Sequence, residues 1–349
     1  MPLEELGPGD RILRNPFEGI DDEEPPEFVI LDEEDFAGED PQLIGFLNEL
    51  DLLPLKSTDE AFNHLLKIVG FHTGDGSFSG PQTWFYGDPE DLEAIRADIE
   101  AIGFTPSRVY ERQRQHEIDG NRFERTEYSF KSGSKAFKAL LVQLGVPDGP
   151  KVDSAFAVPE YLDRLADWQQ ALYLSAFFGA EMSAPDTLSA KNFYAPSVSH
   201  NRLADERAAG EQFMRDLMRH LNDLGVRTNA LEEVERTDRA DGPTVRYRFG
   251  VKGDSRNLIR FFTRIGYRYA GEKQRRAMLA TEYLKRKEQA IERRARIADE
   301  AKALADGGMP PGEIESRFDD VNTRFVERSI WSGRKGRPRP PMDFPDFES

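Results

Sequence analysis

Two carboxylates, Asp75 and Glu181, stand in similar surroundings in two separate parts of the chain. Each ends an apolar run with helical spacing, over 64–75 and 172–181. Each run also has two small residues four positions apart, which allow two helix backbones to approach closely: Gly70 and Gly74 in the first, Ala176 and Ala180 in the second. If these helices pack together, the two carboxylates emerge side by side. Such a pair is a ligand set for a divalent metal ion.

The two runs resemble the paired motifs of the LAGLIDADG (DOD-type) homing endonucleases. The first ends Gly74-Asp75-Gly76, whereas Met182 replaces the final glycine of the family pattern in the second. Asp-Gly alone is a common turn signal, so the resemblance depends on the repeat of the motif. It implies two pseudo-symmetric αββαββα halves and an enzyme that makes a double-strand break at a specific DNA site. It also implies that Asp75 and Glu181 are the catalytic ligands of Mg²⁺.

The same resemblance implies that one lysine from each half assists at the scissile phosphate. Lys131 and Lys252 occupy equivalent positions near predicted strand ends, where a solvated lysine is the alternative interpretation. Gln82 is a weaker candidate for positioning water. His72 is expected to be structural, and the other histidines lack metal-ligand spacing.

Arginines alternate along two predicted hairpins whose turns are marked by Asp119-Gly120 and Asp241-Gly242. A two-stranded ribbon fits the major groove of DNA, and arginine can read guanine edges. The alternative is cross-strand ion pairing with the glutamates of the same strands. The candidate DNA-binding residues of these hairpins are Arg108, Arg112, Arg114 and Arg122 in the first and Arg246 and Arg248 in the second.

The net charge of −17 is distributed unevenly over the 349 residues. Residues 1–51 contain 17 Asp and Glu against two arginines, whereas 252–296 contain 14 Lys and Arg against five acids. A basic region of this kind is compatible with nucleic-acid contact, and a solvated helix face is the alternative. Lysine is scarce, at 13 against 34 arginines, as in salt-tolerant (halophilic) proteins.

The composition also excludes several classes of protein. Because the chain has no cysteine, it has neither disulfides nor cysteine-ligated zinc. No apolar run approaches the length of a membrane span, and the N-terminus lacks a signal-peptide pattern. A soluble, cytoplasmic protein without a membrane partner is therefore expected.

The chain is organised as a repeat. Residues 57–146 predict helix, strands, helix, hairpin and helix, and 158–266 predict the same order. Ile102-Gly103-Phe104 corresponds to Leu224-Gly225-Val226 at the end of the second helix of each half. An α+β fold follows from this order, and the paired acids distinguish it from a generic α+β repeat.

Different segments flank the two halves. Pro2–Ile12 resembles a segment of intein splicing domains, with an acidic linker as the alternative. Residues 272–303, 313–318 and 321–331 predict helices, capped before the last by Asp319-Asp320, in the order of a helix-turn-helix or a plain bundle. Arg324 and Arg328 of the last helix are candidate DNA contacts. The tail around Arg337 resembles an AT-hook, with a flexible basic tail as the alternative.

We expect domains at 1–55, 56–150, 151–270, 271–332 and 333–349. The tracts 265–276 and 336–345 resemble inteins of RtcB-type tRNA-splicing ligases. The chain lacks the terminal residues of splicing chemistry, so it is not expected to splice. The leading prediction is a monomeric homing endonuclease on double-stranded DNA, inserted in or excised from a host protein. The alternatives are a non-catalytic DNA-binding protein of the maturase or regulator kind, and an inactive intein remnant.

Overall fold

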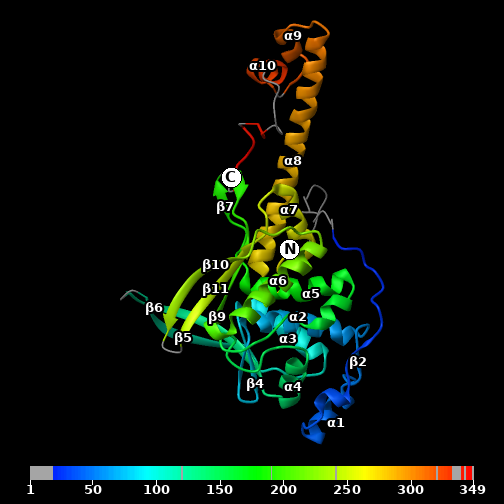
Figure 1. Ribbon diagram of the computed structural model, residues 1–349, viewed down its shortest axis with the longest axis vertical. Coiled ribbons are helices and arrows are strands. Elements are labelled where there is room, and N and C mark those ends of the chain that lie inside the picture. The colour runs from blue at the N-terminus through cyan, green and yellow to red at the C-terminus, as the bar shows by residue number, and fades with distance from the viewer. Residues whose placement is uncertain are drawn as a thin grey trace, which may run out of the picture. The chain divides into compact units, whose positions relative to one another are not determined.

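The computed structural model (Figure 1) describes residues 19–118, 121–189, 191–239, 242–319, 321–331, 339–341 and 343–347. For 116–118, 121–123 and 235–239 the structure describes the backbone alone. The chain divides into two compact units. Unit 1 comprises Met1–Asp186 and Tyr194–Met278, and unit 2 comprises Thr187–Phe193 and Leu279–Ser349. The fold mixes α and β structure, as predicted.

The first half of unit 1 contains a four-stranded antiparallel sheet in the order β3-β4-β6-β5. Residues 77–86 form two of the strands expected after the first helix, separated by the turn at Gly80-Pro81. Strands β5 and β6 pair far beyond β4 and form a two-stranded ribbon. The elements are α2 (Glu60–Asp75), β3 (Ser77–Ser79), β4 (Gln82–Tyr86), α3 (Pro89–Ala101), β5 (Tyr110–Ile118), β6 (Asn121–Ser132) and α4 (Lys135–Gln143).

The second half has a similar order of elements, but its sheet, β10-β11-β9, has one strand between the first two helices where the first half has two. Strand β8 (Asn192–Phe193) pairs with β7 (Thr187–Ser189) in unit 2, whereas β9, which follows it in the chain, belongs to the sheet of unit 1. Asp119, Gly120 and Asp241 lie outside the described residues. The elements in unit 1 are α5 (Asp167–Glu181), β9 (Ser197–Leu203), α6 (Arg207–Asp223), β10 (Glu232–Arg239), β11 (Gly242–Gly250), α7 (Ser255–Arg260) and the π-helical turn η5 (Phe261–Ile265).

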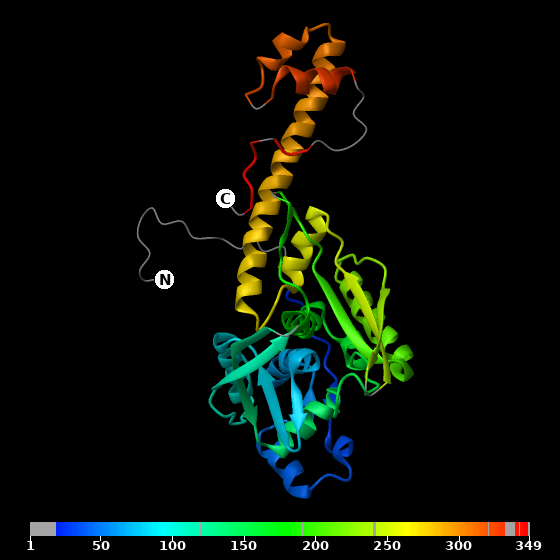
Figure 2. The same cartoon turned by 90° about the vertical axis from the view of Figure 1, so that its left-hand side faces the viewer.

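Helices α2 and α5 lie side by side, and Figure 2 shows the two sheets on different sides of this helix pair. Both helices are therefore apolar around most of their circumference. In α2 the side chains of Phe62, Leu65, Leu66 and Ile68 have no exposed surface. Helix α5 matches it with Tyr173, Leu174, Ala176 and Phe177. The packing of α2 against α5 therefore sets the positions from which the chain continues after each helix.

The acidic N-terminal region is partly folded. Strand β1 (Val29–Leu31) pairs with β2 (Leu55–Lys56), and the turn η2 (Glu33–Phe36) and helix α1 (Pro41–Glu49) lie between them. The Asp40 carboxylate accepts a hydrogen bond from the Gln42 backbone N–H and caps α1. Some of the acidic residues thus begin helices. The intein-like segment Pro2–Ile12 lies outside the described residues.

In unit 2, the last turns of α8 (Gly271–Asp306) pack with α9 (Pro311–Glu315) and α10 (Thr323–Trp331) around Ala301, Ile314 and Val326. The predicted helix order is confirmed, but the N-cap of α10 is Asn322, whose side chain accepts from the Phe325 N–H. Asp320 and Arg337 lie outside the described residues. Across the described part of the chain, no helix is both long and apolar enough to cross a lipid bilayer.

Candidate metal and phosphate site

The contact between α2 and α5 is close enough to exclude larger side chains. A Cβ atom added at Gly70 would lie 2.3 Å from the carbonyl oxygen of Tyr173, and one added at Gly74 would lie 2.7 Å from the Cβ of Ala180. Gly70 of α2 therefore faces the backbone of α5 at Tyr173, and Ala176 of α5 is fully buried. This backbone approach brings the C-terminal ends of the two helices together.

Asp75 is the last residue of α2, and Glu181 is the last residue of α5. A Cβ atom at Gly74 would lie 3.0 Å from Glu181 Cγ, so the Glu181 side chain crosses the end of α2. Asp75 retains exposed surface although protein atoms surround most of its carboxyl group, and Glu181 is partly buried. Among the described residues, neither carboxylate has a hydrogen-bond or ion-pair partner. The two acids are thus adjacent and unpaired.

The chain leaves both helices in an extended conformation, with φ of −85° at Gly76 and −86° at Met182. Backbone strain therefore does not require glycine at either position. Gly76 is instead required by contact, because a Cβ atom there would lie 2.2 Å from the ring of His72. His72 is buried between aromatic rings, and burial lowers its pKa to about 3, which agrees with a structural role.

Burial raises the pKa of both carboxyl groups. The pKa of Glu181 rises to about 7, mainly by burial and further by the charge of Asp75, while Lys151 and Lys273 oppose the rise. Burial also raises the pKa of Asp75 against the same two lysines. The negative ends of the helix dipoles add to this unfavourable environment for two anions. A cation bound here would offset the cost of burying the two carboxylates, the repulsion between them and the effect of the helix dipoles.

Lys151 and Lys273 each cap one of the two helices from outside. The Lys151 ammonium donates to the carbonyl of Gly74 at 2.6 Å. The Lys273 ammonium donates to the carbonyls of Gly179 at 2.7 Å and Met182 at 3.0 Å. Lysines near helix C-termini satisfy terminal carbonyls and favour the dipole. Among the described residues, neither ammonium forms an ion pair with Asp75 or Glu181, so the carboxylate oxygens remain available.

Replacing Lys273 with methionine is expected to destabilise unit 1 by about 1.5–3 kcal/mol, because charged hydrogen bonds to buried carbonyls are lost. Urea denaturation measures this change. The matched control is Lys135→Met, at an exposed lysine on the first turn of α4, for which we expect a change of at most about 0.5 kcal/mol. Equal effects of the two variants would contradict the capping role.

The backbone of Lys151 is held by Arg202 of β9. The Arg202 side chain is fully buried, donates to the Lys151 carbonyl, and lies over the ring of Phe156 with Cζ 3.9 Å from its centroid. Burial lowers its pKa to about 10. The segment between the two halves is thus anchored to the second sheet at the residue whose ammonium reaches Gly74.

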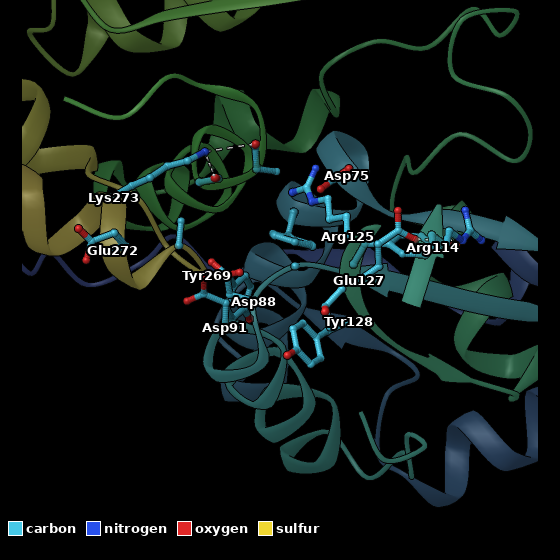
Figure 3. Close-up of a pocket in the computed structure, with 17 residues that line it drawn as sticks. Asp75, Asp88, Asp91, Arg114, Arg125, Glu127, Tyr128, Tyr269, Glu272 and Lys273 are labelled. Atoms are coloured by element: carbon cyan, nitrogen blue, oxygen red, sulfur yellow. Dashed lines mark hydrogen bonds and ion pairs between the residues drawn. The ribbon is translucent and has the colours of Figure 1, made fainter. Parts of the chain in front are cut away.

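A cavity of about 720 Å³ opens beside the helix ends (Figure 3). Helix α2 contributes Asp75, and the ribbon β5–β6 contributes Arg114 and Arg125. Lys273 lies on another wall. The cavity thus combines anionic and cationic groups. Its remaining charged residues are Asp88, Asp91, Glu127 and Glu272. No group of three or more histidine, cysteine, aspartate or glutamate side chains that could hold a metal ion is found among the described residues.

The structure places the other predicted active-site residues elsewhere. Lys131 pairs with Trp84 across β4 and β6, and its ammonium lies 5.2 Å from the centre of the Trp84 ring. Lys252 is exposed, two residues beyond β11, and so does not match Lys131 in strand register. Gln82 is partly buried at the start of β4. None of these residues lines the cavity.

The predicted arginines have varied surroundings. Arg108 precedes β5 instead of lying on it, since the strand begins at Tyr110. Arg112 is exposed, and Arg114 forms an ion pair with Glu127 at 3.1 Å. Of the remaining candidates, Arg122 pairs in register with Glu117, Arg246 donates to Asn201, Arg248 donates to Ser197, and Arg324 and Arg328 are exposed on α10.

Sequence reasoning missed Lys151 and Lys273. Lys151 stands in the segment between the halves, after Gly149-Pro150, and Lys273 lies in the tract 265–276 that was noted only for its resemblance. Neither has a characteristic spacing to the acids. The only signal was the scarcity of lysine, which does not identify a position.

No family model matches the chain. It is similar to tRNA-splicing ligase RtcB of Methanopyrus kandleri, with 32% identity over 360 residues that cover 100% of this chain and 35% of the ligase. The RtcB ligase of Pyrococcus furiosus is 32% identical over 364 residues, covering 99% of this chain and 36% of the ligase. The chain thus spans about a third of the length of the curated relatives it matches.

Two relatives from Methanocaldococcus jannaschii have other names. A subunit of DNA-directed RNA polymerase is 29% identical over 263 residues, covering 72% of this chain and 19% of the subunit. The replication factor C small subunit is 24% identical over 306 residues, covering 86% of this chain and 16% of that protein. The chain is thus similar to parts of three kinds of protein, which are named as RtcB ligases, an RNA polymerase subunit and a replication factor subunit.

These findings contradict the predicted function. The predicted relation to RtcB-type ligases is confirmed as similarity over the whole chain. The predictions of a DNA endonuclease of the LAGLIDADG or intein type and of double-stranded DNA as partner are corrected, because these relatives are named for RNA ligation. The two alternatives, a non-catalytic DNA-binding protein and an inactive intein remnant, are corrected for the same reason. The physical reason for the error is that paired carboxylates indicate a metal ion and a phosphate. They do not distinguish DNA from RNA.

Proposed function

We propose that this chain is a nucleic-acid-processing module within a larger protein of the tRNA-splicing ligase type. The similarity to about a third of each RtcB ligase supports this placement. The similarity of much of the same chain to a polymerase subunit and a replication factor indicates a module carried by proteins with different activities. Such a module has a site of its own, separate from the activity of the protein that carries it.

The site of the module is the pair Asp75 and Glu181, which holds a divalent cation, with Mg²⁺ as our specific proposal. The observation that carries this proposal is that two unpaired carboxylates meet at the ends of two touching helices. Magnesium is commonly bound by one or two carboxylates, with substrate phosphate and water completing the shell. The residues present fit this ligand set. When bound, the cation supplies charge relief and orientation at a phosphate group.

The substrate is an RNA backbone phosphate, as the names of the ligase relatives favour. Lys151 and Lys273 hold the helix ends and place positive charge beside the acids. Arg125, on the cavity wall, is placed to contact a neighbouring phosphate, since guanidinium groups bind phosphate through paired hydrogen bonds. The predicted site lysines Lys131 and Lys252 and the exposed arginines Arg112 and Arg324 remain proposed contacts to the flanking strand.

The finer architecture is also part of this proposal. The order of elements recurs in the two halves, and α2 and α5 end in the same way. We infer that the halves are related by an approximate twofold axis between these helices, with domain limits as expected from the sequence. The helices α9 and α10 of unit 2, with Arg324 and Arg328 exposed, are proposed as a further nucleic-acid contact.

Isothermal titration with Mg²⁺ or Mn²⁺ tests the site. The chain is expected to bind about one cation, and Asp75→Asn and Glu181→Gln are each expected to weaken binding by at least about tenfold, since each removes a ligand of the two-carboxylate set. RNA binding should increase when the cation is added. The matched control is Asp88→Asn, which changes another carboxylate of the same cavity. Loss of binding in Asp88→Asn with full binding in Asp75→Asn would place the cation elsewhere.

A further inference from the structure

One face of the first sheet carries aromatic and basic side chains. The register aligns Trp84 with Lys131 and Tyr86 with Ser129, and Ser129 aligns in turn with Tyr110. Cross-strand partners share a face, so these residues form one surface, which we call the open face of the first sheet. The opposite face packs inward, where Phe85 and Phe130 are fully buried with ring centroids 4.9 Å apart.

On the open face, the rings of Tyr86 and Tyr110 are exposed and that of Trp84 is partly exposed. Tyr86 is 38% exposed and Tyr110 is 37% exposed. The rings of Trp84 and Tyr86 are nearly parallel, at 14°, with centroids 6.4 Å apart. Exposed apolar side chains that lie next to one another often mark a site of interaction with a ligand or partner. Two parallel rings offer flat apolar surfaces of the size of a nucleobase.

The charge around these rings favours a polyanion. The Lys131 ammonium lies over Trp84, and the Arg108 guanidinium lies 5.7 Å from the centroid of the Tyr110 ring. Arg112 is exposed two residues beyond Tyr110 on the same face. The acid of this face within the ribbon, Glu127, is engaged by Arg114. Aromatic rings interleaved with basic side chains are the usual means of binding single-stranded nucleic acid.

We propose that the open face is a stacking platform for unpaired bases of an RNA strand, with Trp84 and Tyr86 as the stacking residues. The inference rests on the proposed function, because Tyr86 also lines the cavity that contains Asp75. A strand can therefore pass from the rings to Asp75. Bases within a duplex are already stacked on their neighbours and cannot cover these rings, so unpaired strands should be preferred.

Tryptophan fluorescence tests the platform directly. In a Trp168→Phe, Trp331→Phe variant the remaining tryptophan is Trp84. Its emission is expected to be quenched by a short oligouridylate, and much less by a blunt duplex of the same length. Trp84→Leu should weaken oligouridylate binding at least about fivefold, whereas Trp84→Phe should retain most of it, since a ring remains. The control Tyr194→Leu removes an aromatic side chain that is 54% exposed and lies outside the sheets, and should change nothing.

The outcomes separate the platform from the metal site. Loss of strand binding in Trp84→Leu with unchanged Mg²⁺ titration supports the platform. Equal binding of strand and duplex, or normal strand binding in Trp84→Leu, overturns it while leaving the metal site intact. If wild type binds no cation yet its strand binding still depends on Trp84, the platform stands and the proposed metal site fails.

Discussion

Leucine at position 70 is expected to prevent unit 1 from folding. The added Cβ alone would lie 2.3 Å from the carbonyl oxygen of Tyr173, which is backbone and cannot rotate away. The two helices form the centre of the unit, so separating them exposes Phe62 and Phe177, which are fully buried. Even Gly70→Ala should lower the free energy of unfolding by about 1–3 kcal/mol, the usual cost of overpacking. Urea denaturation and the yield of folded protein measure both variants.

Gly45→Ala is the matched control, because Gly45 lies inside helix α1 and an added Cβ would meet no atom within 4 Å. Alanine is a better helix former than glycine, so this variant should gain about 0.5–1 kcal/mol. The two substitutions are chemically identical, and both occur within helices. If Gly70→Ala were as stable as Gly45→Ala, the close contact of α2 and α5 would be disproved, together with the adjacency of the two acids.

The central helices were predictable because their residues encode them locally. Apolar runs with helical spacing end at Asp75 and at Glu181, and both helices end there in the structure. The hairpins were predictable from the alternation of side chains along their strands. The order of helices in unit 2 was predictable from charged helical stretches and the glycines that interrupt them. The residue at which strand pairing begins was harder to predict from the sequence. Arg108 was placed on a strand that begins at Tyr110, because alternation does not show where pairing starts.

The electrostatic environment of the site was not predictable, because it depends on contacts between distant segments. Lys151 reaches Gly74 across 77 positions, and Lys273 reaches Gly179 across 94. Helix periodicity and local motifs carry no information about such contacts. The substrate was mispredicted for a related reason. Carboxylates that bind a metal ion do not contact the sugar, so Asp75 and Glu181 carry no signal for the kind of nucleic acid.

The stability of the metal-free protein should fall as the pH rises through about 7, and Glu181→Gln should remove much of this fall. Glu181 has an ordinary pKa of 4.5, raised in the folded protein to about 7. Between these values the folded protein holds a proton that the unfolded chain has lost. The contribution of this group to the free energy of unfolding is therefore complete below the lower value and is lost as the pH passes the higher one. Asp75, with a raised pKa, acts in the same direction.

The expected difference between wild type and Glu181→Gln, taken from about pH 5 to about pH 8, is on the order of 2 kcal/mol after allowing for solvent screening of a partly exposed group. Urea denaturation at several pH values without divalent cations measures it. Added Mg²⁺ should restore the wild type at the higher pH but not Glu181→Gln, because the cation binds the ionised carboxylates. Parallel pH profiles for the two proteins would show that Glu181 ionises at its ordinary pKa. The unfavourable environment that a cation would relieve at Glu181, chiefly burial with a smaller contribution from the charge of Asp75, would then be absent.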